Sequence, residues 1–514
     1  MSAVQITIDG RRVEVEPGRT VLEAARKIGL DIPTLCHLEK CGPLTSCLVC
    51  LVKVAHNGQG RLVPSCATRV EPGMVIESET EEVHQARRTA LELLFSDHVG
   101  DCLSPCQRLC PLQLNIPMML RQIQAARLDE AIATVRQALP LAGVLGRLCH
   151  HPCEQGCRRG LFDDPAAIRD MERFLTDHDL KQDSARSIEC LSQQAASGKQ
   201  SVAIIGAGPA GLAAAYDLAR RRCAVTVMDR NAKPGGQLRH VPEEHLPAAV
   251  MQAEIALLAH MGVHFRAGVE LGNQVTLEGL RREFDAILLA TGAASAVRAD
   301  PATCLSSAPN IFAAGACVKP VKQLVRAMAE GRAAAECVHR FLRGQPPRRP
   351  EKPFSSLMGR LEPGELKEFL REASHEHRVA PCDRCAGASR QEAGRESARC
   401  LHCDCRSSGQ CLLQHYAQVY GADASRFRSE RRPFVQQSQP GGVIFEPGKC
   451  IDCGICIKLT GMAAEPLGLA FVGRGFNVRV AAPFDRPIQE GLQKVAEECV
   501  RHCPTGALAF ADKV

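Results

Sequence analysis

Twenty-seven of the 514 residues are cysteines, and most fall into groups with short internal spacings. Thiolates at such spacings bind iron–sulfur clusters or zinc. A disulfide scaffold is the alternative use of many cysteines, but such scaffolds are short secreted chains. This chain is long and begins MSAVQITIDG, without the apolar core of a signal peptide. We therefore expect reduced thiols and a cytoplasmic location.

The first cysteine group lies in residues 1–82 and consists of Cys36, Cys47, Cys50 and Cys66. Cys47 and Cys50 can bind one iron from a tight loop, and the outer two can hold the other. The stretches IPTLCHLEKCGPLTSCLVCLVKV and LVPSCATRVEPGMVI resemble the [2Fe–2S] domain of the complex I large iron–sulfur subunit and of related hydrogenases. Cys41 does not fit that pattern, and a zinc site or a buried-thiol cluster is the alternative.

Local signals agree with a small β-rich domain here. The strands QITI and VEV flank Asp9-Gly10, which is a strong hairpin signal, and Thr20 is expected to cap a short helix.

Residues 83–185 are expected to be helical, with cysteines between the helices. RTALELLFSDHVGDC resembles the histidine-ligated cluster segment of the complex I subunit, in which a His precedes the first Cys by four positions, as His98 precedes Cys102. The continuation with RLCHHPCEQGCRRGLFDDPAAIRDMERF resembles the double [4Fe–4S] domain of the glutamate synthase small subunit and dihydropyrimidine dehydrogenase. That resemblance implies ligands exchanged between two cysteine groups.

Carried over by position, the resemblance gives two clusters. One is on Cys102, Cys106 and Cys157, with His98 as fourth ligand. The other is on Cys110, Cys149 and Cys153, with Glu172 as fourth ligand. His98 as a helix-end cap and Glu172 as an exposed carboxylate are the alternatives.

Residues 200–343 begin with SVAIIGAGPAGLAAAYDLARRRCAVTVMDR, a strand, a glycine turn, a helix and a strand. In this fingerprint Gly206 permits the turn, Gly208 lets backbone approach a pyrophosphate, and Gly211 permits close packing. Asp229 is expected to accept ribose hydroxyls. Later motifs resemble the remaining FAD contacts of the glutamate synthase small subunit, and they contain Gly236, Gly292 and Gly315.

Two departures from that family stand out. Ala316 follows Gly315 where the family has Asp, and only 17 residues separate Gly292 from Asn310, where the family inserts a second Rossmann unit for NADPH. We therefore expect an FAD domain without a nicotinamide site; an empty, structural domain of the same fold is the alternative.

Residues 355–440 are expected to form another cluster or zinc segment. Its candidate ligands are Cys400, Cys403, Cys405 and Cys411, with Cys382 and Cys385 upstream, and the choice among them stays open.

Residues 441–514 begin like a bacterial ferredoxin, with Cys450, Cys453 and Cys456. Cys503, before Pro504, is the expected fourth ligand. Thr460 stands where a second cluster would need a cysteine, so we expect one [4Fe–4S] cluster here and an unused Cys499.

These observations predict a multidomain α+β and α/β protein. Its parts are a β-grasp [2Fe–2S] domain, a helical double-cluster domain, a Rossmann-type FAD domain and a C-terminal ferredoxin-like domain. We expect an electron-transfer subunit with one [2Fe–2S] cluster, three or four [4Fe–4S] clusters and FAD, and with no catalytic residues of its own.

The resemblances imply partners such as an NADH-oxidising flavoprotein subunit and a hydrogenase or formate dehydrogenase subunit, in NAD(P)-linked or electron-bifurcating complexes. A glutamate synthase small subunit-like NADPH oxidoreductase is the alternative. Scarce aromatic residues argue against nucleic-acid binding, and no apolar run is long enough for a membrane span.

Overall fold

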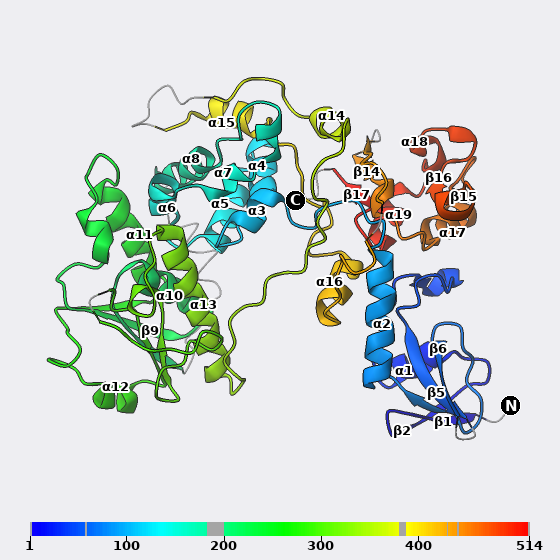
Figure 1. Cartoon of the computed structure of the whole chain (residues 1–514), viewed down its shortest axis with the longest axis horizontal. Coiled ribbons are helices and arrows are strands. Elements are labelled where there is room, and N and C mark those ends of the chain that lie inside the picture. Colours follow the sequence, from blue (N-terminus) through cyan, green and yellow to red (C-terminus); the bar gives the residue numbers. More distant parts are fainter. Residues whose placement is uncertain are drawn as a thin grey trace. The chain divides into compact units, whose positions relative to one another are not determined.

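The structure is a computed structural model that describes residues 3–56, 59–181, 200–293, 295–379, 387–428, 430–438 and 442–511. The chain divides into two compact units (Figure 1). The first unit consists of residues 1–104, 353–371 and 403–513, and the second of residues 105–352 and 372–402. The chain therefore leaves the first unit after Ser104 and returns to it twice.

The N-terminal part of the first unit is a five-stranded sheet with strand order β2-β1-β7-β5-β6. Asp9 and Gly10 have φ angles of 45° and 77°, which suit the two-residue hairpin predicted between β1 and β2. Thr20 and Glu23 form a capping box at the start of α1, as expected of Thr20. The elements are β1 (Val4–Ile8), β2 (Arg11–Val15), α1 (Val21–Lys27), β5 (Leu51–His56), β6 (Gln59–Pro64) and β7 (Val75–Glu77), with a short pair β3 (His37–Leu38) and β4 (Gly42–Pro43).

Helix α2 (Glu81–Leu94) ties this sheet to a late segment of the chain. Arg87 on α2 is fully buried; it donates hydrogen bonds to the Leu51 carbonyl at 2.9 Å and to the Tyr420 hydroxyl at 2.7 Å. Tyr420 ends α16 (Leu412–Val419), so the helix after the sheet packs against residues that follow some 300 positions later.

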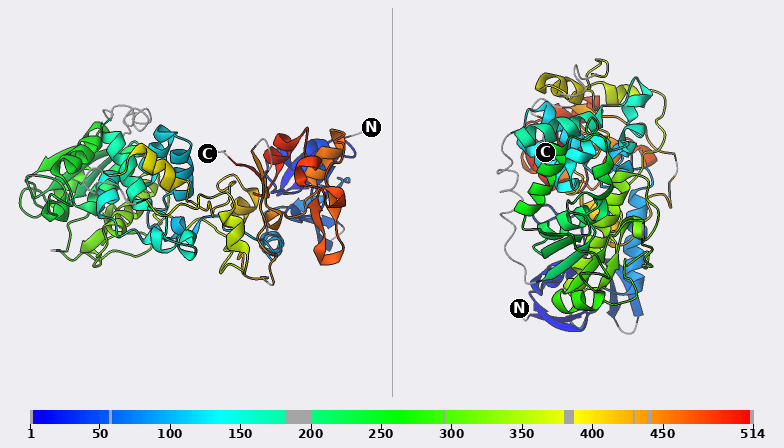
Figure 2. Two further views of the ribbon diagram at one scale, coloured as in Figure 1. Left: turned by 90° about the horizontal axis from the view of Figure 1, so that it is seen from above. Right: turned by 90° about the vertical axis from the view of Figure 1, so that its left-hand side faces the viewer.

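The rest of the first unit is built from short elements. They are α14 (Glu365–Leu370), β13 (Gln437–Ser438), β14 (Val443–Phe445), α17 (Ile455–Met462), β15 (Ala470–Val472), β16 (Arg479–Ala481), α18 (Ile488–Gly491), α19 (Ala496–His502) and β17 (Leu508–Phe510). One apolar core joins Leu35 and Phe95 of the N-terminal part to Phe445 and Leu508 of the C-terminal part. Figure 2 shows these blue and red parts of the unit side by side.

The second unit combines a helical part with a Rossmann-type part. The helical part contains α3 (Pro105–Leu109), α4 (Ile116–Gln124), α5 (Leu128–Ala138), α6 (Ala142–Leu148), α7 (Pro152–Gln155) and α8 (Ile168–Lys181), and α15 (Arg390–Ser397) packs against α4 and α8. Arg399, fully buried, pairs with Glu396 and with Asp163 at 2.7 and 3.0 Å, so the segment after α15 is fastened to the helical part.

The Rossmann-type part is a parallel sheet with strand order β10-β9-β8-β11-β12. Helices α10 and α13 lie side by side against one face (Figure 1), and Leu280 of α12 packs against the other. The strand–turn–helix–strand predicted from residue 201 is present. The elements are β8 (Ser201–Ile205), α10 (Pro209–Arg220), β9 (Ala224–Asp229), α11 (Ala248–His260), β10 (His264–Ala267), α12 (Leu277–Glu283), β11 (Ala286–Leu289), β12 (Ile311–Ala313) and α13 (Leu324–Leu342).

A buried ion network joins the two parts of the second unit. Arg136 of α5 donates to Glu254 of α11 at 2.7 Å and to Asp179 of α8 at 2.8 Å. Glu254 also accepts the Gly143 N–H at 2.6 Å, and the Tyr216 hydroxyl donates to the Arg136 carbonyl at 2.6 Å. A buried charge with this many partners fixes the helices in one arrangement.

The predicted multidomain fold, with ferredoxin-like, helical and Rossmann-like parts, is confirmed. The two units nevertheless cut across the expected ranges, because residues 83–104 pack with the N-terminal sheet and residues 355–440 are shared between the units. Residues 182–199, between the expected helical and Rossmann-type ranges, lie outside the described residues. Within the described part of the chain, none of the helices combines the length and apolar character that a membrane crossing requires.

Candidate metal centres and nucleotide cradle

The four N-terminal cysteines converge in the first unit. Cys36 and Cys47 come from the loops around β3 and β4, Cys50 precedes β5, and Cys66 follows β6. All four are at least 96% buried, and the Cys50 and Cys66 sulfurs are 3.4 Å apart. A hydrogen bond from Cys47 lowers the pKa of Cys36, and one from Cys66 lowers the pKa of Cys50.

In each of these pairs one cysteine therefore loses its proton more easily than the other. The resulting thiolate is the form that binds metal. The negative charge of Cys36 also works to raise the pKa of Cys50 and of Cys66. The two pairs are therefore close together and belong to one site. Among the described residues, no three His, Cys, Asp or Glu side chains are arranged to share a single metal ion. Cluster ligands bind different irons and need not converge on one point, so the four thiols fit a [2Fe–2S] cluster.

A second thiol group in the first unit combines Cys102 with Cys405 and Cys411. The Cys405 N–H donates to the Cys102 carbonyl at 3.3 Å. Burial raises the pKa of Cys411 to about 12, and the charges of Cys405 and Cys102 contribute to the rise. The geometry thus groups Cys102 with two late cysteines, whereas the expected partners Cys106 and Cys157 belong to the second unit.

His98 lies on the same segment as Cys102. Its Nδ1 atom is buried and has no hydrogen-bond partner. Burial and the charge of Lys449 lower the pKa of His98 to about 3, so the imidazole is neutral. A neutral imidazole with an unpartnered nitrogen suits metal ligation better than helix capping.

Cys102 is also held by a segment from a third part of the unit. The Ser356 N–H donates to the Cys102 sulfur at 3.4 Å, and the two side chains are 3.2 Å apart at Oγ and Sγ. Sequence reasoning missed Ser356, because no spacing motif links it to the cysteines.

The second unit brings Glu172 together with Cys110, Cys149 and Cys153. Glu172 is 6% exposed, and burial raises its pKa to about 8. Burial and the Glu172 charge raise the pKa of all three thiols, to about 11 for Cys110 and about 12 for Cys149. Glu172 is therefore a buried member of this group, and the exposed-carboxylate alternative is wrong. Three thiols and one carboxyl group are four candidate donors, the number that a [4Fe–4S] cluster takes.

The remaining candidates of this region are distributed more loosely. The charge of Cys106 contributes to the raised pKa of Cys153. The side chains of Cys157 and Cys400 pack against the buried core that contains both residues. Cys403 begins the last segment of the first unit. Cys382 and Cys385 lie outside the described residues, so their part in a site stays a prediction.

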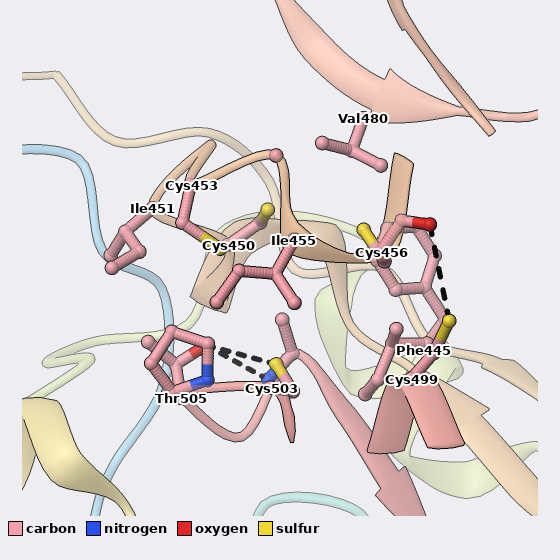
Figure 3. A pocket seen from close by; sticks show the side chains of 14 residues that line it. Phe445, Cys450, Ile451, Cys453, Ile455, Cys456, Val480, Cys499, Cys503 and Thr505 are labelled. Atoms are coloured by element: carbon pink, nitrogen blue, oxygen red, sulfur yellow. Dashed lines mark hydrogen bonds between the residues drawn. The ribbon is translucent and has the colours of Figure 1, made fainter. Parts of the chain in front are cut away.

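The C-terminal cysteines line one cavity. Cys450, Cys453 and Cys456 border it from the start of α17, and Cys503 from the end of α19 (Figure 3). Burial raises the pKa of Cys453 to about 12, and Cys503 contributes. A cavity lined by four thiols fits the [4Fe–4S] cluster expected there.

Two positions near this cavity bear on the expected loss of a second cluster. Thr460 is 1% exposed; its hydroxyl donates to the Ile457 carbonyl at 3.0 Å and accepts the Leu469 N–H at 3.2 Å. It therefore has a structural role in its helix. Cys499 is also buried, and it borders the same cavity as the four expected ligands (Figure 3).

The three thiol groups of the first unit act on one another in sequence. The charge of Cys36 acts on Cys453, which links the N-terminal group to the C-terminal cavity. The charge of Cys503 acts on Cys411, which links the cavity to the Cys102 group. Cys36, Cys411 and Cys453 also belong to one buried core, so all three groups adjoin it.

The glycine turn after β8 has the form of a nucleotide cradle. Gly206 has a φ of 110°, and a Cβ there would collide with the Ala290 carbonyl. A Cβ on Gly211 would collide with the Gly206 carbonyl, whereas a Cβ on Gly208 would meet nothing within 4 Å. Open space over Gly208 at the start of α10 is where a pyrophosphate would be received, so the turn fits a dinucleotide.

The other expected nucleotide contacts lie around this turn. Asp229 ends β9 and accepts the Ala207 N–H at 2.7 Å. A Cβ on Gly236 would lie 2.9 Å from the Gly208 Cα, so this glycine permits the close approach of the PGGQLR loop. Gly292 and Gly315 have φ angles of 78° and 80°, in the region that favours glycine.

Three segments match known domain families. Residues 1–81 match the 2Fe-2S iron-sulfur cluster binding domain. Residues 77–184 match dihydropyrimidine dehydrogenase domain II, 4Fe-4S cluster, and residues 204–257 match the NAD(P)-binding Rossmann-like domain. The resemblances of these three parts, and the [2Fe–2S] and [4Fe–4S] cofactors, are thereby confirmed.

Three curated relatives each match 37–40% of the chain. The NADP(+)-dependent formate dehydrogenase subunit beta of Moorella thermoacetica is 39% identical over 208 residues, 37% of this chain and 29% of the relative. The NADPH-Fe(3+) oxidoreductase subunit beta of Geobacter sulfurreducens is 35% identical over 193 residues, 37% of this chain and 28% of the relative. The NAD-dependent dihydropyrimidine dehydrogenase subunit PreT of Escherichia coli is 37% identical over 210 residues, 40% of this chain and 50% of the relative. The chain thus spans half or less of the length of these relatives.

Proposed function

We propose that this chain, which carries a [2Fe–2S] domain, a [4Fe–4S] domain and a Rossmann-like domain, is an electron-transfer subunit of a multi-subunit oxidoreductase. Bound clusters would supply one-electron storage, and bound FAD would exchange single electrons and electron pairs. The role of the chain's own residues is to hold these groups in order and to exclude water from them.

The proximity of the thiol groups in the first unit carries the proposal. Cys36, Cys411 and Cys453, one from each of three candidate cluster sites, belong to the same buried core. A structural zinc site needs no neighbour of its own kind, whereas electron transfer requires successive sites close together. The arrangement therefore favours a relay over a zinc-bearing scaffold.

We assign the relay sites as follows, from the contacts in each unit. The [2Fe–2S] site is on Cys36, Cys47, Cys50 and Cys66, and the C-terminal [4Fe–4S] site on Cys450, Cys453, Cys456 and Cys503. A split [4Fe–4S] site is on His98, Cys102, Cys405 and Cys411. In the second unit, Cys110, Cys149, Cys153 and Glu172 hold a further [4Fe–4S] cluster, and Cys106, Cys157 and Cys400 are candidates for another.

The Rossmann-type part is proposed to bind FAD and to lack a site for NADH or NADPH. The cradle at Gly208 and the loop at Gly236 support FAD binding. Only 17 residues lie between Gly292 and Asn310, too few for a second Rossmann unit. The alternative function, an independent NADPH oxidoreductase like the glutamate synthase small subunit, is disfavoured by this short connection.

Partner subunits would supply the nicotinamide and substrate sites that we propose this chain lacks. Its relatives include subunits of a formate dehydrogenase, an NADPH-Fe(3+) oxidoreductase and a dihydropyrimidine dehydrogenase. We propose a cytoplasmic complex with an NADH-oxidising flavoprotein subunit and a catalytic subunit of the hydrogenase or formate dehydrogenase kind.

Anaerobic purification from the native cell tests this proposal. We expect iron, acid-labile sulfide and FAD in the purified chain, together with co-purifying oxidoreductase subunits. Zinc with negligible sulfide would refute the electron-transfer function and support the scaffold.

A further inference from the structure

Lys449 is a buried cation beside the split site. Its side chain is 2% exposed. The Val99 N–H donates to the Gly448 carbonyl at 2.7 Å, which brings Lys449 against the segment that carries His98 and Cys102. A Cβ on Gly100 would lie 2.6 Å from Lys449 Cε, so the lysine stem runs directly over this glycine.

The charge of Lys449 is maintained although it is buried. Lys449 forms a buried ion pair with Glu446. Glu446 is 4% exposed and also accepts a hydrogen bond from Gln436 at 3.1 Å. The Glu446 carboxylate therefore balances the Lys449 ammonium in surroundings with little water.

The segment of the split site lies against this lysine. Gly100, over which the Lys449 stem runs, stands between His98 and Cys102, and the Cys405 N–H donates to the Cys102 carbonyl at 3.3 Å. One buried cation thus lies beside the segment that carries two of the four proposed ligands.

We propose that Lys449 raises the reduction potential of the split site by holding a positive charge beside it. Reduction adds one electron to the bound cluster, taken from a neighbouring cluster of the relay, and makes and breaks no covalent bond. A nearby cation stabilises the added negative charge, and a dry environment strengthens the effect. Glu446 opposes Lys449 in part, so the potential depends on both members of the pair.

The inference rests on the proposed cluster at Cys102, Cys405 and Cys411, so the experiment first identifies that cluster. Low-temperature EPR of the anaerobic holoprotein, reduced stepwise with dithionite, is compared between the wild type and Cys405→Ala. The signal that Cys405→Ala removes belongs to the split site. If Cys405→Ala removes no signal, the cluster assignment fails, and that failure is distinct from failure of the role of Lys449.

Lys449→Met then tests the charge. At a potential where half of the wild-type site is reduced, we expect the reduced-to-oxidised ratio to fall about tenfold, a shift of about 59 mV for one electron. Glu446→Gln should raise the midpoint potential of the same signal, because it removes a negative charge. If Lys449→Met loses the cluster, Glu446→Gln is the variant that tests the charge pair. Lys449→Arg should restore the wild-type value.

Lys53→Met is the matched control, because Lys53 pairs with Glu82 at 2.8 Å in the same unit but is 30% exposed. It should leave the potential unchanged, because water screens an exposed charge. An unchanged midpoint in Lys449→Met, with the signal intact, overturns the inference. If the signal is lost in Lys449→Met, an unchanged midpoint in Glu446→Gln overturns it as well.

Discussion

The backbone N–H of Cys405 donates a hydrogen bond to the carbonyl of Cys102 at 3.3 Å. These two cysteines stand on opposite sides of the whole second unit in the sequence. The contact predicts that both residues hold one cluster. Cys102→Ala and Cys405→Ala should therefore remove the same [4Fe–4S] signal in low-temperature EPR.

Cys106→Ala separates this grouping from the one expected from the spacing. In our assignment it leaves the signal of Cys102 and Cys405 intact, because Cys106 belongs to the second unit. Loss of one common signal in Cys102→Ala and Cys106→Ala, with Cys405→Ala normal, would contradict the split site. Cys223→Ala, at a buried cysteine outside every proposed site, is the control for packing.

The C-terminal cavity gives a second contrast between cysteines. Cys503→Ala should remove or convert one [4Fe–4S] signal, since it takes away a thiolate ligand. Cys499→Ala should leave the iron content unchanged, because too few thiols remain for another cluster. Both residues border the cavity, so the comparison separates ligation from packing. Equal iron loss per chain from the two variants would show that Cys499 is a ligand.

The glycine turn separates flavin binding from folding. Gly208→Ala should leave folding intact, because a Cβ there meets nothing within 4 Å, and should lower FAD content. Gly211→Ala should destabilise the Rossmann-type part itself, because its Cβ collides with the Gly206 carbonyl. Flavin absorbance and thermal unfolding measure the two effects. Full FAD content in Gly208→Ala would show that no pyrophosphate lies over this turn.

The 17 residues between Gly292 and Asn310, which we interpret as too few for a second Rossmann unit, lead to a kinetic prediction. NADH or NADPH alone should not reduce the isolated chain at a catalytic rate, and adding an NADH-oxidising flavoprotein partner should restore reduction. Stopped-flow absorbance under anaerobic conditions follows cluster bleaching. Rapid bleaching by NADPH without a partner would support the independent oxidoreductase instead.

Arg136 should be among the most sensitive positions for the stability of the second unit. Arg136→Met leaves Glu254 and Asp179 buried without their partner, which costs about 3–5 kcal/mol. Arg127→Met, at the start of the same helix, breaks only a partly exposed pair with Glu130 and should cost about 0–1 kcal/mol. Denaturant unfolding of the two variants measures the difference, and similar losses would show that the buried network is unimportant.

The local features of the fold could be predicted from short sequence patterns. The hairpin at Asp9-Gly10 and the cap at Thr20 depend on neighbouring residues, and the glycine turn at Gly206 carries its own fingerprint. The grouping of Cys102 could not be predicted in this way. Spacing connects it to Cys106, but its contacts are with Cys405, and only the folded chain brings those two together.

Lys449 and Ser356 were missed for a related physical reason. Neither residue belongs to a ligand motif, and their importance comes from burial beside cysteines that are distant in the sequence. A lysine before a ferredoxin cysteine gives no sign in the sequence that its side chain is directed to another site. The position of Gly100 was the available hint, since a glycine between His98 and Cys102 leaves space for a neighbouring side chain.

The separation of Cys102 from Cys405 also fixes an order of events during synthesis. At about 5–20 residues per second, a ribosome needs roughly 15–60 s to make the residues between them. During that time the nascent chain displays His98 and Cys102 without their partners, while most of the intervening unit is completed. The split site that we propose would therefore form late: a chain that terminates before Cys405 includes the cysteines of the proposed [2Fe–2S] site and the glycine turn, but it lacks Cys405 and Cys411.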